Sequence, residues 1–227
     1  MVPAGRGRRR TKRGNAAGGA GAGGAADRAG ARAHSRLLST VRWELIPLKN
    51  FAEQCAFLPP GSTVTVTASP NKTLEDTLDL CEQLGAAGHK PVPHVAARMV
   101  RSRGHLAELA ARIAALGMDE IFLVGGDQPE PAGAYAAAVE LLEDLLTHVA
   151  AGAPVLTRIG VPSYPDGHAL IADDDLRGAL LRKQELLAAA GIASHAATQM
   201  CFDAAKIVAW LRAERAAGLR LPVLIGI

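Results

Sequence analysis

The sequence predicts an α/β fold of the TIM-barrel type, and three observations support this. From Leu37 onward, short apolar runs alternate with amphipathic stretches of helical periodicity. Such alternation is typical of βαβ units and a parallel sheet. Glycines follow the expected helices, where a left-handed residue can end a helix. No glycine-rich dinucleotide-binding turn follows the first expected strand, so a barrel is favoured over a doubly wound sheet.

Seven strands are expected, at residues 42–46, 62–67, 91–96, 120–125, 156–162, 194–199 and 221–226. The fourth is the clearest, because its residues 121–124 are wholly apolar, as in a strand buried on both faces. Gly125 and Gly126 follow it and allow a tight turn or the close approach of a ligand.

A full barrel of this type has eight βα units. The sequence ends at Ile227, in or just after the seventh strand, and therefore predicts a (βα)8 barrel that lacks its last unit. The first and seventh strands would then present open edges, which favour pairing with other chains. We expect residues 1–227 alone to be poorly soluble or self-associated, and the natural chain to continue.

The expected helices show the same logic. Thr73-Leu74-Glu75-Asp76 has the pattern of a capping box, and an apolar stripe follows it at Leu74, Leu78, Cys81 and Leu84. The next helix carries Leu106, Leu109, Ile113 and Leu116 at similar spacing. The helices are expected to stop at Gly88, Gly117, Gly152, Gly191 and Gly218.

Composition divides the chain at residue 36. Residues 1–36 are rich in Gly, Ala and Arg and predict a disordered basic tail, whereas residues 37–227 predict the catalytic barrel. The tail holds nine of the 25 Lys and Arg residues and one of the 22 acidic residues, which leaves 16 basic and 21 acidic residues in the barrel. The barrel is therefore mildly acidic, and we expect no specific nucleic-acid partner.

The three cysteines have no metal-like spacing and are expected to be free thiols in a reducing cytoplasm. No apolar run is long enough to span a membrane, and no signal peptide is recognisable. We expect a cytoplasmic protein without a membrane partner.

Several polar residues stand at or near the carboxyl ends of the expected strands, where barrels place their chemistry. They are Glu44, Thr67, His94, Asp127, Tyr164, His168 and Gln199. Glu44 lies between Trp43 and Leu45, and burial there would raise its pKa toward the range of a general acid. The alternative for Glu44 is an ion pair with Arg42 or another barrel residue.

Other residues leave two interpretations open. Asp127 can serve chemistry at a strand end or cap the N-terminus of a helix. His94 can be a hydrogen-bonded core residue or a catalyst. His89, His105, His148 and His195 are expected on turns or helix surfaces, without the geometry of a metal site.

The ordered motifs resemble the methylenetetrahydrofolate reductase family over about residues 41–227. Residues 43–47, Trp-Glu-Leu-Ile-Pro, are similar to the family's F-E-x-x-P-P strand, and Val66-Thr67 and Pro93-His94 to its V-T and P-H pairs. Gly126-Asp127 with Pro129 resembles R-G-D-x-P. Residues 164–168 resemble Y-P-x-G-H, residues 198–203 fit T-Q-x-x-F-D, and residues 222–227 resemble P-I-I-P-G-I.

The resemblance implies a folate enzyme of one-carbon metabolism and methionine biosynthesis. It would reduce 5,10-methylenetetrahydrofolate to 5-methyltetrahydrofolate with NADH or NADPH. Glu44 would be the general acid, Asp127 and Gln199 would act in catalysis and hold the pterin, and Phe202 would contact the substrate. In the family, the positions of Thr67, His94, Tyr164 and His168 line the flavin (FAD) site.

Two departures bear on the flavin. Gly125 stands where the family has the Arg of R-G-D, and Ala68-Ser69-Pro70-Asn71 replaces a glycine-rich turn. We therefore expect FAD to bind weakly or not at all, with hydride passing directly from a nicotinamide as in some family members. Arg182 and Lys183 are candidates to replace the lost charge.

Two rival functions stay open. One is a related barrel reductase that acts on another pterin or uses a deazaflavin donor. The other is a catalytically inactive folate-binding or assembly protein. The sequence leaves the choice of NADH or NADPH and the oligomeric state undecided.

Overall fold

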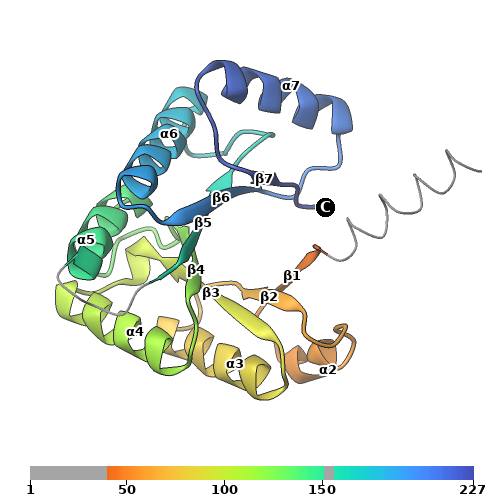
Figure 1. The fold of residues 1–227 in the computed structure, drawn as a ribbon, viewed down its shortest axis with the longest axis vertical. Helices are drawn as coiled ribbons and strands as arrows, with labels where there is room; N and C mark the ends of the chain where they lie inside the picture. The colour runs from red at the N-terminus through yellow and green to blue at the C-terminus, as the bar shows by residue number, and fades with distance from the viewer. Residues whose placement is uncertain (1–39, 151–155) are drawn as a thin grey trace, which may run out of the picture. The chain divides into compact units, whose positions relative to one another are not determined.

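The curled sheet of Figure 1 organises the molecule. The structure is a computed structural model that describes residues 40–150 and 156–227. Its seven strands are all parallel and follow the order β1-β2-β3-β4-β5-β6-β7. They are β1 Arg42–Leu45, β2 Thr63–Val66, β3 Lys90–Ala96, β4 Glu120–Val124, β5 Arg158–Ser163, β6 Ala193–Thr198 and β7 Val223–Leu224. In the described part of the chain, β1 pairs only with β2 and β7 only with β6, so the sheet has two open edges.

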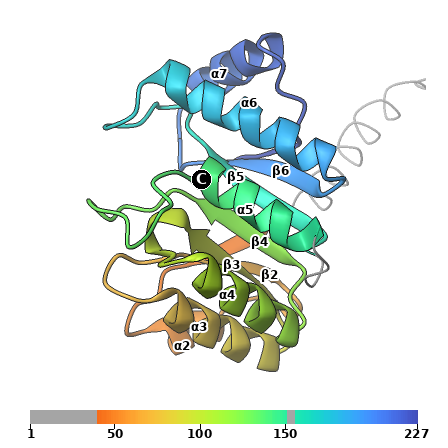
Figure 2. The same cartoon turned by 90° about the vertical axis from the view of Figure 1, so that its left-hand side faces the viewer.

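Helices cover the outer face of the sheet (Figure 1). They are α2 Phe51–Cys55, α3 Leu74–Ala86, α4 Arg103–Ala115, α5 Ala138–Ala150, α6 Asp173–Ala189 and α7 Ala204–Ala216, with a 3-10 turn, η1 Ala97–Met99, after β3. Figure 2 shows α3, α4, α5 and α6 side by side along this face. None of the helices in residues 40–150 and 156–227 is long and apolar enough to cross a membrane.

Side-chain alternation explains which face of the sheet meets the helices. Outward residues are apolar and fully buried, such as Val64, Leu123 and Ile159, each with 0% exposure. The alternate residues of each strand, which point to the other face, include both polar and apolar side chains. The strand register places Glu44 beside Thr65 and His94 beside Phe122. Because neighbouring partners of a parallel pair face the same way, these residues lie on the concave face.

Local signals in the sequence are confirmed. Thr73 accepts a hydrogen bond from the Asp76 amide, and Asp76 accepts one from the Thr73 amide, which completes the capping box. The stripe Leu74, Leu78, Cys81 and Leu84 is buried. Gly88, Gly117, Gly191 and Gly218 all have positive φ after their helices.

Seven strands were expected and seven are found, with boundaries that differ by a few residues. The largest difference is β7, which covers two residues against six expected. The α/β class and the curled parallel sheet are confirmed. The predicted tail at residues 1–36 and the helix stop at Gly152 lie outside the described residues.

The amino ends of the strands carry an ion-pair cluster on the concave face. Arg42 of β1 donates to both carboxylate oxygens of Glu120 of β4, at 2.5 and 3.2 Å. Arg158 of β5 approaches Glu120 at 3.6 Å, and His195 Nδ1 of β6 lies 3.8 Å from it. The cluster joins four strands through one carboxylate.

Two histidine predictions are wrong. His195 was expected on a turn or helix surface, but it belongs to β6, points into the concave face and is 4% exposed. His105 does lie on a helix, α4, but it is buried, and its Nε2 is 3.0 Å from Glu75 of α3. In both cases the ring lies against an acidic side chain from a distant segment, Glu120 for His195 and Glu75 for His105, and the local sequence does not reveal this contact.

Candidate active site

The carboxyl ends of the parallel strands form one rim, and the predicted residues lie along it. Thr67 directly follows β2, and its amide donates to Leu45 O at 3.0 Å. Gln199 directly follows β6, and its amide donates to Ser163 O at 2.8 Å. These bonds extend the sheet by one residue and fix where each side chain begins. The Gln199 side chain is exposed and Thr67 is half-buried.

Glu44 stands one residue before the end of β1. Its side chain is 59% exposed, and its Oε2 lies 3.6 Å from Nε2 of His94. Loss of hydration raises the pKa of Glu44, and a hydrogen bond with Thr65 acts in the opposite direction. The predicted alternative of an ion pair with Arg42 is wrong, because the Arg42 guanidinium is held by Glu120.

His94 is a buried neighbour of this acid. It is 8% exposed and stacks on Phe122 with a centroid distance of 4.8 Å. Burial lowers its pKa to about 4, so the ring is neutral at pH 7. Its Nε2 has no hydrogen-bond partner among the described residues. At 3.6 Å the two groups are slightly too far apart for a hydrogen bond, and Nε2 stays available as an acceptor for a protonated neighbour.

Asp127 lies in the β4–α5 loop, residues 125–137. No helix begins there, since α5 starts at Ala138, so the helix-cap interpretation is wrong. Its side chain is exposed, and no hydrogen bond or ion pair involves its carboxylate within residues 40–150 and 156–227. The pKa of Tyr164 is raised, first by burial and then by the negative charge of Asp127.

Gly126 explains how the backbone reaches this position. Its φ is +99°, and a Cβ there would lie 3.1 Å from the Ala96 Cβ. A glycine is therefore needed both for the conformation and for the contact with β3. Gly125 differs, because a Cβ at that position meets nothing within 4 Å.

The remaining predicted residues come from the β5 and β6 sides of the rim. Tyr164 and His168 meet edge to face at a centroid distance of 5.3 Å. Phe202 is 80% exposed and Met200 is 64% exposed. The rim thus offers exposed apolar surface beside Gln199, which suits a flat aromatic ligand.

The expected replacements for the lost strand-four arginine do not supply a free cation. Arg182 donates to Glu143 of α5 at 2.9 Å and lies 3.7 Å from Glu185. Lys183 is 5% exposed in the middle of α6, and burial lowers its pKa to about 8. Both residues lie at mid-helix and not at the rim.

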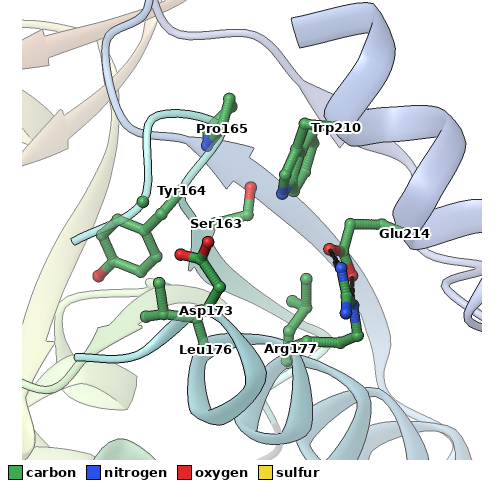
Figure 3. A pocket seen from close by; sticks show the side chains of 10 residues that line it. Ser163, Tyr164, Pro165, Asp173, Leu176, Arg177, Trp210 and Glu214 are labelled. Atoms are coloured by element: carbon green, nitrogen blue, oxygen red, sulfur yellow. Dashed lines mark hydrogen bonds and ion pairs between the residues drawn. The ribbon is translucent and has the colours of Figure 1, made fainter. Parts of the chain in front are cut away.

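A separate cavity of about 90 Å³ lies between the β5–α6 loop, α6 and α7 (Figure 3). Ser163, Asp173, Trp210 and the Arg177–Glu214 ion pair line it. Drug-sized ligands occupy pockets of roughly 300–1,000 Å³, so the cavity is too small for a whole pterin or flavin. Of the predicted site residues it includes only Tyr164.

Within residues 40–150 and 156–227, no group of three His, Cys, Asp or Glu side chains is placed to hold a metal ion. Sequence reasoning also overlooked one rim residue, Arg98 of η1, whose guanidinium contacts the β4–α5 loop. Its position four residues after His94 carries no motif that would have identified it.

Comparison with known families decides the assignment. The family model described as methylenetetrahydrofolate reductase matches residues 48–227. The chain belongs to the methylenetetrahydrofolate reductase family. This makes it a member of a family of folate-related oxidoreductases, and Asp127, Gln199 and the predicted flavin residues Thr67, His94, Tyr164 and His168 fall within the matched segment. Glu44 precedes the matched segment by four residues, so its role rests on its own environment.

Similarity to one solved structure supports the fold alone. A protein from Burkholderia cenocepacia J2315, provisionally described as a lyase/mutase, matches with a TM-score of 0.51 and 18% identity, over 81% of this chain and 66% of that chain. A muconate lactonizing enzyme from Klebsiella pneumoniae matches with a TM-score of 0.45 and 18% identity, over 82% of this chain and 52% of that chain. The chain spans from about half to two thirds of the length of these two proteins.

Proposed function

We propose that the chain reduces 5,10-methylenetetrahydrofolate to 5-methyltetrahydrofolate with a hydride from NADH or NADPH. The observation that carries the proposal is Glu44, a rim carboxyl group with a raised pKa beside a neutral, buried histidine. Family membership supplies the substrate class. Opening of the folate ring requires a general acid, and a raised pKa shifts a carboxyl group in the direction that this role needs.

The chemical steps balance with one proton and one hydride. Glu44 donates its proton to N10 of the folate as the bond between N10 and the bridging carbon breaks. The bridging carbon is left as an iminium on N5 and accepts hydride from C4 of the dihydronicotinamide. The products are the N5-methyl group and the oxidised nicotinamide, and solvent returns a proton to Glu44.

Asp127 and Gln199 would serve the pterin side of the reaction. The Asp127 carboxylate is exposed and forms no ion pair within residues 40–150 and 156–227, so it can favour the cationic iminium. The Gln199 amide can donate to and accept from the pterin edge. Phe202 offers an exposed aromatic face for the substrate.

The residues fit a flavin poorly. A flavin dinucleotide carries two phosphates, and the positions expected to meet them offer Gly125 and no free arginine in α6. His94, in the predicted flavin set, is buried against Phe122 and has its Nε2 toward Glu44. A charge-assisted hydrogen bond contributes roughly 1.5–3 kcal/mol, so its loss weakens binding by about one to two orders of magnitude. Direct hydride transfer from the nicotinamide is therefore part of the proposal.

The test is NADH and NADPH oxidation by the purified protein, with and without 5,10-methylenetetrahydrofolate. We expect folate-dependent oxidation and a colourless protein that retains no flavin absorbance after incubation with FAD and removal of the unbound FAD. Binding of the folate without oxidation would favour the inactive folate-binding protein. Turnover only with a reduced deazaflavin would favour the rival reductase, and a tightly held yellow cofactor would overturn direct transfer.

A further inference from the structure

Arg98 connects the β3 side of the rim to the β4–α5 loop. Its Nε donates to Gln128 O at 2.6 Å, one terminal nitrogen donates to Pro129 O at 2.6 Å, and the other donates to Ala136 O at 3.1 Å. Its backbone adds two bonds, from its amide to Gly125 O at 2.9 Å and from the Ala132 amide to its carbonyl at 2.8 Å. One residue thus makes five hydrogen bonds to this loop.

The bonds flank Asp127 on both sides. Gly125 precedes Asp127 by two residues, and Gln128 and Pro129 are the next two after it. Asp127 has no hydrogen bond or ion pair of its own in the described part of the chain. The position of its carboxylate is consequently set by the backbone on either side of Asp127, and Arg98 hydrogen-bonds to that backbone.

The far end of the loop has separate anchors. Tyr135 is buried and its hydroxyl donates to Asp144 of α5 at 2.9 Å. The amides of Ala136 and Ala137 donate to Glu140 at 2.6 and 3.1 Å. Loss of the Arg98 side chain would therefore release the segment around Asp127 while α5 keeps its first turn.

We propose that Arg98 is the positioning residue for Asp127. It holds the β4–α5 loop in the one conformation that presents this carboxylate to the pterin, and it acts through Asp127 without touching the substrate. The inference rests on the proposed function for the role of Asp127, whereas the hold of the side chain on the loop rests on its three guanidinium bonds, since the two backbone bonds remain in any Arg98 variant.

The chemistry needs an arginine. Three carbonyls at different directions require the fixed fork of a guanidinium, which carries five N–H donors in one plane. A lysine has a single ammonium centre and cannot reach the three acceptors together. Arg98→Lys keeps the positive charge but should therefore lose the positioning of Asp127.

The experiment compares Arg98→Met and Arg98→Lys with Arg101→Met as the matched control. Arg101 lies in the same β3–α4 connection, but its side chain pairs with Glu75 of α3. Backbone order parameters from ¹⁵N relaxation are expected to fall at Asp127 and Gln128 from about 0.85 to below about 0.6 in both Arg98 variants. The Arg101 variant should keep the wild-type values.

The kinetic readout is the split between kcat and KM. A reacting group displaced by about 1 Å can cost on the order of 100-fold. We expect kcat to fall about 10- to 100-fold in both Arg98 variants, with KM for the nicotinamide unchanged. Asp127→Asn should lower kcat too, and the double variant Arg98→Met/Asp127→Asn should lose no more than Asp127→Asn alone.

Each result decides the inference. Unchanged order parameters in the Arg98 variants would overturn it, and so would additive losses in the double variant. If the wild-type protein shows no folate-dependent turnover, the proposed function fails first. The affinity of the wild type, the two single variants and the double variant for tetrahydrofolate is then measured by calorimetry. Non-additive losses of affinity support the inference, and additive or absent losses overturn it.

Discussion

Charged side chains at the two ends of the concave face differ in whether they are paired. At the amino ends of the strands, Glu120 is contacted by Arg42 and Arg158, with His195 beside it. At the carboxyl ends, Glu44 lies beside the neutral His94 and hydrogen-bonds with Thr65, and no cationic side chain pairs with Glu44 or Asp127 among the described residues. Charges at the first end join strands, whereas charges at the second end are available to a ligand. In barrels the carboxyl end carries chemistry and the amino end carries stability.

The largest effect should come from the rim. Replacing Glu44 with Gln removes the proton donor but keeps the size of the side chain, and general acid catalysis contributes about 10²–10⁴-fold. We expect turnover to fall by that factor, with folate still bound and the melting temperature unchanged. Near-normal turnover would remove Glu44 from the mechanism, and loss of folding would instead assign it a structural role.

Acid should lower the stability of the protein through two buried histidines. Burial lowers the pKa values of His94 and His195 to about 4 from the ordinary 6.5. The unfolded chain then binds more protons than the folded one between these values. The contribution of each histidine to the free energy of unfolding is fully present above pH 6.5. It falls by roughly 3 kcal/mol as the pH drops toward 4.

Urea unfolding at several pH values measures this slope. The groups that face the two rings are Glu44 for His94, and Glu120, Arg42 and Arg158 for His195. His195→Gln should reduce the slope between pH 6.5 and 4. A stability that stays flat from pH 7 to 4.5 in the wild type would contradict the prediction. Glu75, whose pKa is lowered to about 2, loses its contribution only below its ordinary 4.5.

Breaking the ion-pair cluster should be somewhat less costly. Glu120→Gln leaves two arginines facing each other on the concave face, and removal of one partner from a buried pair costs about 3–5 kcal/mol. Because Arg42 and Arg158 keep 24% and 47% side-chain exposure, we expect about 2–3 kcal/mol after allowing for solvent screening. The free energy of unfolding in urea is the measurement.

The control for that variant is Glu108→Gln on the exposed side of α4, which forms no ion pair in the described residues. It should change stability by less than about 0.5 kcal/mol. Equal effects at the two positions would show that the cluster contributes nothing specific.

The sequence was sufficient for the features that are local or periodic. The capping box at Thr73, the helix stops at Gly88 and Gly117 and the buried strand before Gly125 each depend on neighbours within a few residues. Family motifs led to the rim residues, whose positions follow once parallel strands align.

Contacts between distant segments could not be predicted. Arg42 and Glu120 are 78 residues apart, and nothing near either one selects the other. His195 lies in a run of small residues with no apolar partner nearby in sequence, and it is buried because Phe122 and Gly160 leave room for its ring. Arg98 belongs to no motif, and its three acceptors are backbone carbonyls, which every sequence contains.

The smallest effect contrasts two glycines of the concave face and the rim. A Cβ at Gly160 would lie 2.4 Å from Phe122 Cδ2 and 2.7 Å from two atoms of the His195 ring, whereas a Cβ at Gly125 meets nothing within 4 Å. Neither has a positive φ, so the comparison concerns space alone. Overpacking costs typically 1–3 kcal/mol, and we expect that loss for Gly160→Ala.

Gly125→Ala should leave stability unchanged or raise it slightly, because alanine lowers the entropy of the unfolded chain. Urea unfolding of the two variants measures the contrast between the filled interior and the open rim. If Gly160→Ala is tolerated as well as Gly125→Ala, the interior beneath His94 has space that a ligand could enter. The site would then extend below the rim, and Phe122 and His195 would have to be counted among its walls.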